Sequence, residues 1–275
     1  METALLSYFV LDTRLHSTCD FNGRVLENGL GIYEVLRVEA GVPLFLQEHI
    51  DRFFSSAGLE NISPDISRNF IRKAIRLLIA ENRMQQGNVK FLYHRNDKGE
   101  HHFMAWAMPF FYPAPQHYRE GVKVVSMTGE RHNPNAKKAL YSLRQKADEL
   151  IRGKKAWEAV YVNRHGFITE GSRSNVFFVR DTRLETPELS LVLPGITRAK
   201  VILLAAERDI PVIEKQISLS GLPGYDASFL TGTSPKLLPV AEFDGHTFNT
   251  NNEVMRRLMQ AYDDLVAVEV RTFHW

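Results

Sequence analysis

The chain contains a single cysteine, Cys19, among 275 residues, so it cannot form an internal disulfide bond. No apolar segment reaches the roughly 18 uninterrupted residues that a membrane-spanning helix requires. The first residues, Met1 to Val10, lack the basic region and long apolar stretch of a secretory signal peptide. With 44% hydrophobic residues, the sequence predicts a cytoplasmic protein with a hydrophobic core and no membrane partner.

The chain also lacks an excess of charge of either sign. Its 34 basic and 32 acidic residues give a net charge of +2, which provides no extended field for binding nucleic acid. Any site for an anion must therefore be local.

Several common catalytic motifs are missing. The sequence has no P-loop, no dinucleotide-binding glycine fingerprint, no nucleophile elbow and no zinc-protease helix. The histidines His94, His101 and His102 are poor candidates for metal ligands, because neighbouring side chains on a strand point to opposite faces. We therefore expect no metal site, and no hydrolase chemistry.

Turn-forming residues gather near the middle of the chain, from Phe111 to Gln116, where Pro113 and Pro115 lie. This stretch predicts a boundary between an N-terminal domain at 1–112 and a C-terminal domain at 117–275. Strand-like runs outnumber helical ones, and several are joined by short turns, which predicts an α+β fold in both domains. The expected strands are 5–11, 33–38, 89–94, 102–108, 122–126, 159–163, 175–180, 212–214 and 227–230. The expected helices start near 46 and after 65, and cover 140–152, 197–208 and 252–264.

Two turns in the second domain are suited to binding a phosphate group. In the segment Leu193 to Arg198, a strand and a tight turn are expected to lead into a helix, whose first N–H groups are free. Thr197 in this segment can alternatively serve only as the N-cap of the helix. The second turn, Thr231 to Pro235, is rich in hydroxyl groups and follows an apolar strand. Together the two turns can form a phosphate site.

The sequence also contains lysine and glutamate side chains that could act on a cofactor bound through its phosphate. Lys137 and Lys138 precede a predicted helix, and Glu170 lies in a strand-turn-strand unit. A buried lysine amine forms a Schiff base when its pKa is lowered, and a carboxylate can keep a pyridine nitrogen protonated. These are the two protein groups that make pyridoxal 5′-phosphate an electron sink.

The sequence resembles the class IV pyridoxal-phosphate enzymes, which include D-amino-acid aminotransferase, branched-chain aminotransferase and aminodeoxychorismate lyase. Five segments carry the resemblance, in the order and at the spacing of that family. They are Gly-Ile-Tyr-Glu-Val at 31–35, Glu-His-Ile-Asp-Arg at 48–52, Thr-Glu-Gly-x-x-Ser-Asn at 169–175, Leu-Pro-Gly-Ile-Thr-Arg at 193–198 and Thr-Gly-Thr-Ser-Pro-Lys at 231–236. The resemblance implies the two-domain class IV fold, with the cofactor between the domains, and a homodimer.

The resemblance also implies roles for individual residues. Glu170 matches the partner of the pyridine nitrogen. The cofactor phosphate would be bound by Arg52, by Ile196 and Thr197, and by Thr233 or Ser234. Judged from the sequence alone, Arg52 has a simpler explanation as a helix-surface ion pair with Glu48, four residues away.

Either lysine can form the Schiff base. Lys137 precedes Glu170 by 33 residues and Glu158 by 21, and both intervals resemble those of the lyases in this family. Lys138 better matches the family's Lys-x-Leu pattern, through Leu140. The two intervals favour Lys137.

Substrate recognition departs from the family. D-amino-acid enzymes carry an Arg-x-His carboxylate trap on a strand of the first domain, where this chain reads Lys-Gly-Glu-His-His-Phe at 98–103. Tyr33 and Arg37 share one face of a strand at 32–38, so they are the candidates for substrate binding. The alternative is a packed tyrosine and a surface arginine.

These observations predict a pyridoxal-phosphate-dependent aminotransferase that acts on a small amino acid donor and a 2-oxo acid acceptor. The first alternative is an aminodeoxychorismate lyase that forms p-aminobenzoate and pyruvate. The second is a non-catalytic protein of the same fold that binds a phosphate or a cofactor.

Overall fold

The computed structural model describes residues 2–23, 30–95, 99–131, 133–137 and 141–275. The chain forms two compact units. The first contains the chain up to Phe111 together with Ala136–Ala139 and Val266–Trp275. The second contains Tyr112–Asn135 and Leu140–Leu265. In the part of the chain that the structure describes, no helix is both long enough and apolar enough to cross a membrane.

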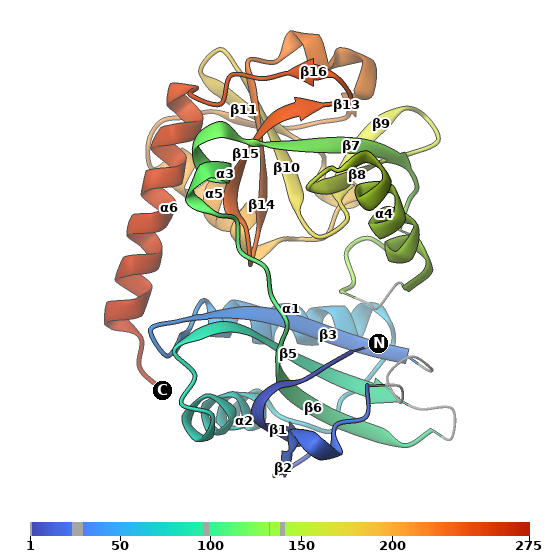
Figure 1. Cartoon of the computed structure of the whole chain (residues 1–275), viewed down its shortest axis with the longest axis vertical. Helices are drawn as coiled ribbons and strands as arrows, with labels where there is room; N and C mark the ends of the chain where they lie inside the picture. Colours follow the sequence, from blue (N-terminus) through green and yellow to red (C-terminus); the bar gives the residue numbers. More distant parts are fainter. Residues whose placement is uncertain (1, 24–29, 96–98, 132, 138–140) are drawn as a thin grey trace. The chain divides into compact units, whose positions relative to one another are not determined.

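The first unit contains an antiparallel sheet with the strand order β2-β1-β6-β5-β3-β4 (Figure 1). Strands β3 and β5 pair along their whole length, with Tyr33 opposite Leu92 and Arg37 opposite Asn88. The strands are β1 (Leu5–Leu11), β2 (Arg14–Ser17), β3 (Leu30–Glu39), β4 (Val42–Pro43), β5 (Gln86–Arg95) and β6 (His101–Met108).

Helices α1 (Leu46–Leu59) and α2 (Arg68–Glu81) supply most of the remaining core of this unit. Alternate residues of β3 and β5 share one face of the sheet. On that face, Ile32, Leu36 and Phe91 are buried in one cluster with apolar side chains of both helices. The side chain of Ser67 caps α2 by accepting a hydrogen bond from the Phe70 N–H at 3.1 Å.

The second unit contains a mixed sheet with the order β12-β11-β10-β14-β15-β7-β8-β9-β13, to which β16 adds beside β15. Parallel pairs join β11 to β12, β15 to β7 and β7 to β8. Its strands are β7 (Val122–Thr128), β8 (Glu158–Val162), β9 (Phe167–Gly171), β10 (Asn175–Arg180), β11 (Arg183–Thr186), β12 (Val212–Glu214), β13 (Ile217–Ser218), β14 (Ala227–Gly232), β15 (Lys236–Phe243) and β16 (His246–Thr247).

Four α-helices are described after Phe111: α3 (Pro115–Glu120), α4 (Tyr141–Lys154), α5 (Ile196–Ala206) and α6 (Glu253–Thr272) (Figure 1). Helix α4 packs on β7 and β8, where Ala147 is buried with Val125 and Tyr161. Single turns of 3-10 helix lie at η1 (Thr18–Asp20) and η3 (Leu189–Leu191), and a longer one lies at η4 (Leu219–Gly224).

The α+β prediction is confirmed, and β1, β10 and β12 have the predicted ends. Helix α2 begins after Asp65 as predicted, at Arg68, where the Ser67 side chain provides the cap. Two local predictions were wrong. The segment before Leu193 is the 3-10 turn η3 rather than a strand. Helix α6 continues to Thr272, past the predicted end at 264, and Val266 within this extension is buried.

Candidate active site

The first unit holds Lys137 by both of its backbone groups. Its N–H donates to the hydroxyl of Ser56 on α1 at 3.1 Å, and its carbonyl accepts from the N–H of Tyr33 on β3 at 3.2 Å. The Lys137 ammonium lies 5.0 Å from the centre of the Tyr33 ring. The other candidate, Lys138, lies outside the described residues.

Arg52 lies on α1, one helical turn before Ser56, and it is bound by a buried carboxylate. Its Nε and Nη2 atoms donate to the two carboxylate oxygens of Glu34, at 2.8 and 2.7 Å. His49 Nδ1 lies 2.8 Å from the same carboxylate. The Arg52 side chain is only 9% exposed. The interpretation of Arg52 as a helix-surface arginine is therefore wrong, since its guanidinium is held inside the unit in a bidentate pair.

The charges of this cluster shift two pKa values. Burial raises the pKa of the Glu34 carboxyl, but the charge and hydrogen bonds of Arg52 and His49 outweigh burial and lower it to about 2. Burial lowers the pKa of His49, and the positive charges of Arg52 and Lys137 lower it further, against the opposing effect of Glu34. At neutral pH the cluster thus contains an ionised Glu34 and a neutral His49.

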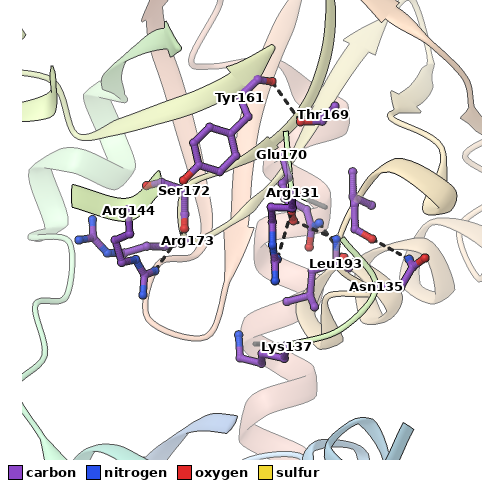
Figure 2. Close-up of polar contacts among 12 residues, drawn as sticks. Arg131, Asn135, Lys137, Arg144, Tyr161, Thr169, Glu170, Ser172, Arg173 and Leu193 are labelled. Atoms are coloured by element: carbon purple, nitrogen blue, oxygen red, sulfur yellow. Dashed lines mark hydrogen bonds and ion pairs between the residues drawn. The ribbon is translucent and has the colours of Figure 1, made fainter. Parts of the chain in front are cut away.

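In the second unit, Glu170 on β9 is held at both carboxylate oxygens (Figure 2). Oε1 accepts from Arg131 Nη1 at 3.2 Å, and Oε2 accepts from the backbone N–H of Leu193 at 2.9 Å. Only 3% of Glu170 is exposed. The buried carboxylate therefore has one charged side-chain donor and one backbone donor.

Ile196 and Thr197 form the first turn of α5 and are buried. Gly195, rather than Thr197, is the N-cap residue, so the alternative role for Thr197 was wrong. The Thr197 hydroxyl lies 3.5 Å from the hydroxyl of Tyr262 on α6. The N–H groups of the first turn have no carbonyl partner within the helix, as at any helix N-terminus, and they carry its partial positive charge.

The second hydroxyl-rich turn joins β14 to β15 and contains Thr233 and Ser234, which are half-buried. Thr231 at the end of β14 is 1% exposed, and its hydroxyl oxygen has no hydrogen-bond partner among the described residues. In the sheet, Thr231 pairs with Asn175 of β10. The Asn175 side chain in turn packs against Gly195, so the two predicted phosphate-binding turns share this neighbour.

Tyr33 and Arg37 lie on the face of β3 opposite to the one that packs on α1 and α2. Arg37 is buried and pairs with Glu39 at 3.0 Å, so the interpretation as a surface arginine was wrong. A second ammonium, that of Lys90, lies 4.6 Å from the Tyr33 ring centre and pairs with Glu2. Tyr33 therefore adjoins two lysines.

Sequence reasoning missed Glu34, His49, Arg131 and Asn175 as members of these clusters. Glu34, His49 and Asn175 stand inside the motif segments, next to residues that were assigned. Nothing in the sequence around Arg131 distinguishes it from other loop arginines. Within the described ranges, no group of three or more His, Cys, Asp or Glu side chains is arranged to hold a metal ion.

Comparison with known proteins identifies the family. Residues 31–243 match the family model described as amino-transferase class IV. The chain belongs to this family. A branched-chain-amino-acid aminotransferase of Pseudomonas aeruginosa is 30% identical over 265 residues, covering 88% of this chain and 86% of that protein. A D-alanine aminotransferase of Bacillus licheniformis is also 30% identical, with coverages of 84% and 89%.

Solved class IV structures share the fold. The branched-chain amino acid aminotransferase of Escherichia coli superposes with a TM-score of 0.87 at 23% identity, over 95% of each chain. A candidate 4-amino-4-deoxychorismate lyase of Legionella pneumophila gives a TM-score of 0.76 at 22% identity, over 86% of this chain and 91% of the other. The predicted class IV fold is thus confirmed.

Proposed function

We propose that this chain is a pyridoxal-phosphate-dependent aminotransferase that moves an amino group between a small amino acid and a 2-oxo acid. The observation that carries the proposal is the setting of Glu170, a buried carboxylate whose two oxygens accept hydrogen bonds from Arg131 and from the Leu193 N–H. A fixed carboxylate of this kind suits a protonated pyridine nitrogen. A protein that only binds a phosphate group has no need of it.

The residues present fit the cofactor. The buried hydroxyl of Thr231 has no hydrogen-bond partner in the part of the chain that the structure describes, and it lies next to the turn that contains Thr233 and Ser234. Arg52 is oriented by Glu34, and a guanidinium matches the geometry of a phosphate. Ile196 and Thr197 add the N-terminus of α5, which favours anions.

Each group has a distinct task in the proposed reaction. When bound, pyridoxal phosphate supplies an electron sink for the electron pair left on the substrate α-carbon. Lys137 Nζ would hold the cofactor covalently and, after exchange with the substrate amine, accept and return the α-proton. Glu170 would keep the ring nitrogen protonated. Arg52, Ile196, Thr197, Thr233 and Ser234 would bind the phosphate, and Tyr33 and Arg37 would contact the substrate.

The active protein would also be a homodimer, as the resemblance to the family implies. Sedimentation equilibrium of the purified protein tests the dimer directly.

A panel of amino donors tests the reaction. L-leucine and D-alanine represent the substrates in the names of the two curated relatives. Each is incubated with 2-oxoglutarate or pyruvate, and the new amino acid is quantified by chromatography. We expect transfer from at least one donor, and no transfer in a Lys137→Ala variant.

An assay with aminodeoxychorismate, run beside the panel, separates the alternatives. Formation of p-aminobenzoate and pyruvate without amino transfer would replace the aminotransferase by the lyase. If the protein binds the cofactor but shows no turnover in either assay, the result would favour the alternative of a non-catalytic protein of the same fold.

A further inference from the structure

Asn175, the first residue of β10, connects two parts of the candidate site in the second unit. Its side-chain amide donates from Nδ2 to the carbonyl of Leu193 at 2.9 Å. The N–H of Leu193 donates to Glu170 Oε2, also at 2.9 Å. Both backbone groups of Leu193 are therefore used, one by Glu170 and the other by Asn175. The Asn175 side chain lies in the interior, since the residue is only 5% exposed.

The other side of the same amide packs against Gly195, the N-cap of α5. A Cβ atom added to Gly195 would lie 2.0 Å from Asn175 Oδ1. Gly195 has a φ of −64°, which any residue adopts. Close approach of the Asn175 amide, rather than backbone conformation, is thus the reason that this position excludes a side chain.

The loop between Glu170 and Asn175 is itself fixed. Glu158 accepts hydrogen bonds from the N–H of Arg173 at 2.5 Å and from the hydroxyl of Ser174 at 3.0 Å. These hydrogen bonds hold the residues directly before Asn175, and so they help to fix the position of Asn175 beside Leu193. Its strand partner on β14 is Thr231, whose hydroxyl has no hydrogen-bond partner among the described residues.

We propose that Asn175 is a positioning residue that, through Leu193, sets the separation between Glu170 and the N-terminus of α5. This inference rests on the proposed function, in which Glu170 serves the ring end of pyridoxal phosphate and α5 serves the phosphate end. Asn175 itself is assigned to neither end of the cofactor, and its side chain contacts Leu193 and Gly195. It would keep Glu170 and the N-terminus of α5 at a fixed distance, so that the ring and the phosphate of one rigid cofactor molecule can be bound at the same time.

The first test uses Asn175→Ala and Asn175→Leu, whose side chain has nearly the shape of asparagine; neither variant can donate a hydrogen bond from residue 175 to Leu193. Titration of each apoprotein with pyridoxal phosphate, followed by absorbance, should show roughly tenfold weaker binding than in the parent, since the part-buried Leu193 carbonyl loses its donor. The absorbance maximum of the bound cofactor should also depend on pH differently from the parent, because Glu170 loses its fixed place. Thermal unfolding verifies that each variant is folded.

Thr186→Val is the matched control. The Thr186 hydroxyl donates to the carbonyl of Val176, the neighbour of Asn175 on β10, at 2.8 Å and in a fully buried position. Its loss removes the same kind of hydrogen bond from the same strand without affecting Leu193. This variant should bind the cofactor as the parent does, with the parent spectrum at every pH.

A double-mutant cycle with Gly195→Ala tests the close approach. Gly195→Ala alone should weaken binding strongly, because the new methyl group meets Asn175 Oδ1. In Asn175→Ala/Gly195→Ala this clash is absent, so the combined loss should be smaller than the product of the two single losses. Single losses that simply multiply would overturn the proposed contact.

The outcomes separate this inference from the function on which it rests. A parent protein that binds no pyridoxal phosphate removes the proposed function, and the role of Asn175 falls with it. A parent that binds the cofactor, with Asn175 variants that match it in affinity and spectrum, overturns only the role of Asn175. The same holds if Thr186→Val weakens binding as much as Asn175→Ala.

Discussion

Arg52 and Glu34 form a bidentate ion pair in the interior of the first unit, with nitrogen–oxygen distances of 2.8 and 2.7 Å. The pair joins α1 to β3, and His49 completes it on the helix side. One buried carboxylate thus fixes the guanidinium that we assign to the cofactor phosphate. A buried charge that loses its partner is strongly destabilising, so the pair has consequences for stability as well as for binding.

Stability should depend on pH through Glu34. Its pKa falls from 4.5 to about 2 on folding, so the unfolded state binds more protons between these values. The stabilising contribution is present above about pH 4.5 and is lost as the pH falls through 2. Glu34→Gln should lower the free energy of unfolding by a few kcal/mol at neutral pH, and the difference from the parent should shrink towards pH 2. Urea denaturation at a series of pH values measures it.

Asp51→Asn provides the comparison, since Asp51 lies on the same helix but forms an exposed pair with Arg68. It should change the free energy of unfolding by less than about 1 kcal/mol. An equal pH dependence in Glu34→Gln and the parent would contradict the role of Glu34.

Arg52→Ala should weaken the binding of pyridoxal phosphate by about 1.5–3 kcal/mol, the range for hydrogen bonds to charged groups. Thr197→Val should have a smaller effect, because the backbone N–H groups of α5 remain. Equilibrium dialysis of the apoproteins gives both values. Arg68→Ala, which removes an exposed arginine, should bind the cofactor like the parent; an Arg52 variant that does the same would refute the phosphate assignment.

Lys137 should be the point of covalent attachment. Purified protein is expected to be yellow, and borohydride reduction followed by peptide mapping should find the cofactor on Lys137. Lys137→Ala should abolish attachment, whereas Lys138→Ala, the change at the adjacent lysine, should retain it. Attachment at Lys138 would transfer the role to that residue, and attachment at any other lysine would invalidate the alignment of motifs.

Glu170→Gln should retain the cofactor but lose most aminotransferase activity. The amide fills nearly the same volume but cannot stabilise a protonated ring nitrogen, so the electron sink weakens. Because the loss occurs in proton removal rather than in substrate binding, kcat and kcat/KM should fall together. Stopped-flow absorbance of the first half-reaction measures the rate.

Glu185→Gln is the control for that change. Glu185 is another buried glutamate of the second unit, bonded to Tyr225 and Arg183, and no role in the reaction is assigned to it. Its variant should react at the parent rate. If Glu170→Gln also reacts at that rate, Glu170 is not the partner of the ring.

Local sequence patterns predicted many of the helices and strands of this protein, and the order of its motifs indicated the family to which it belongs. Strand β10 follows from a run of apolar residues between turn formers, and α5 from a proline-glycine turn before a helical apolar pattern. These signals lie within a few residues of one another, so no tertiary information is needed to recognise them. The order and spacing of the motifs carried the assignment of Lys137, Arg52 and Glu170.

Only the tertiary structure decided which polar groups meet in the interior. Glu34 and Arg52 are separated by 18 residues, and Arg131 and Glu170 by 39. The lengths of helices such as α6 also depended on packing, since Val266 is buried beyond the predicted end. Periodicity is a property of neighbouring residues, whereas the partner of a buried charge depends on the path of the whole chain. For this reason the sequence could name Arg52 and Glu170, but not the groups that hold them.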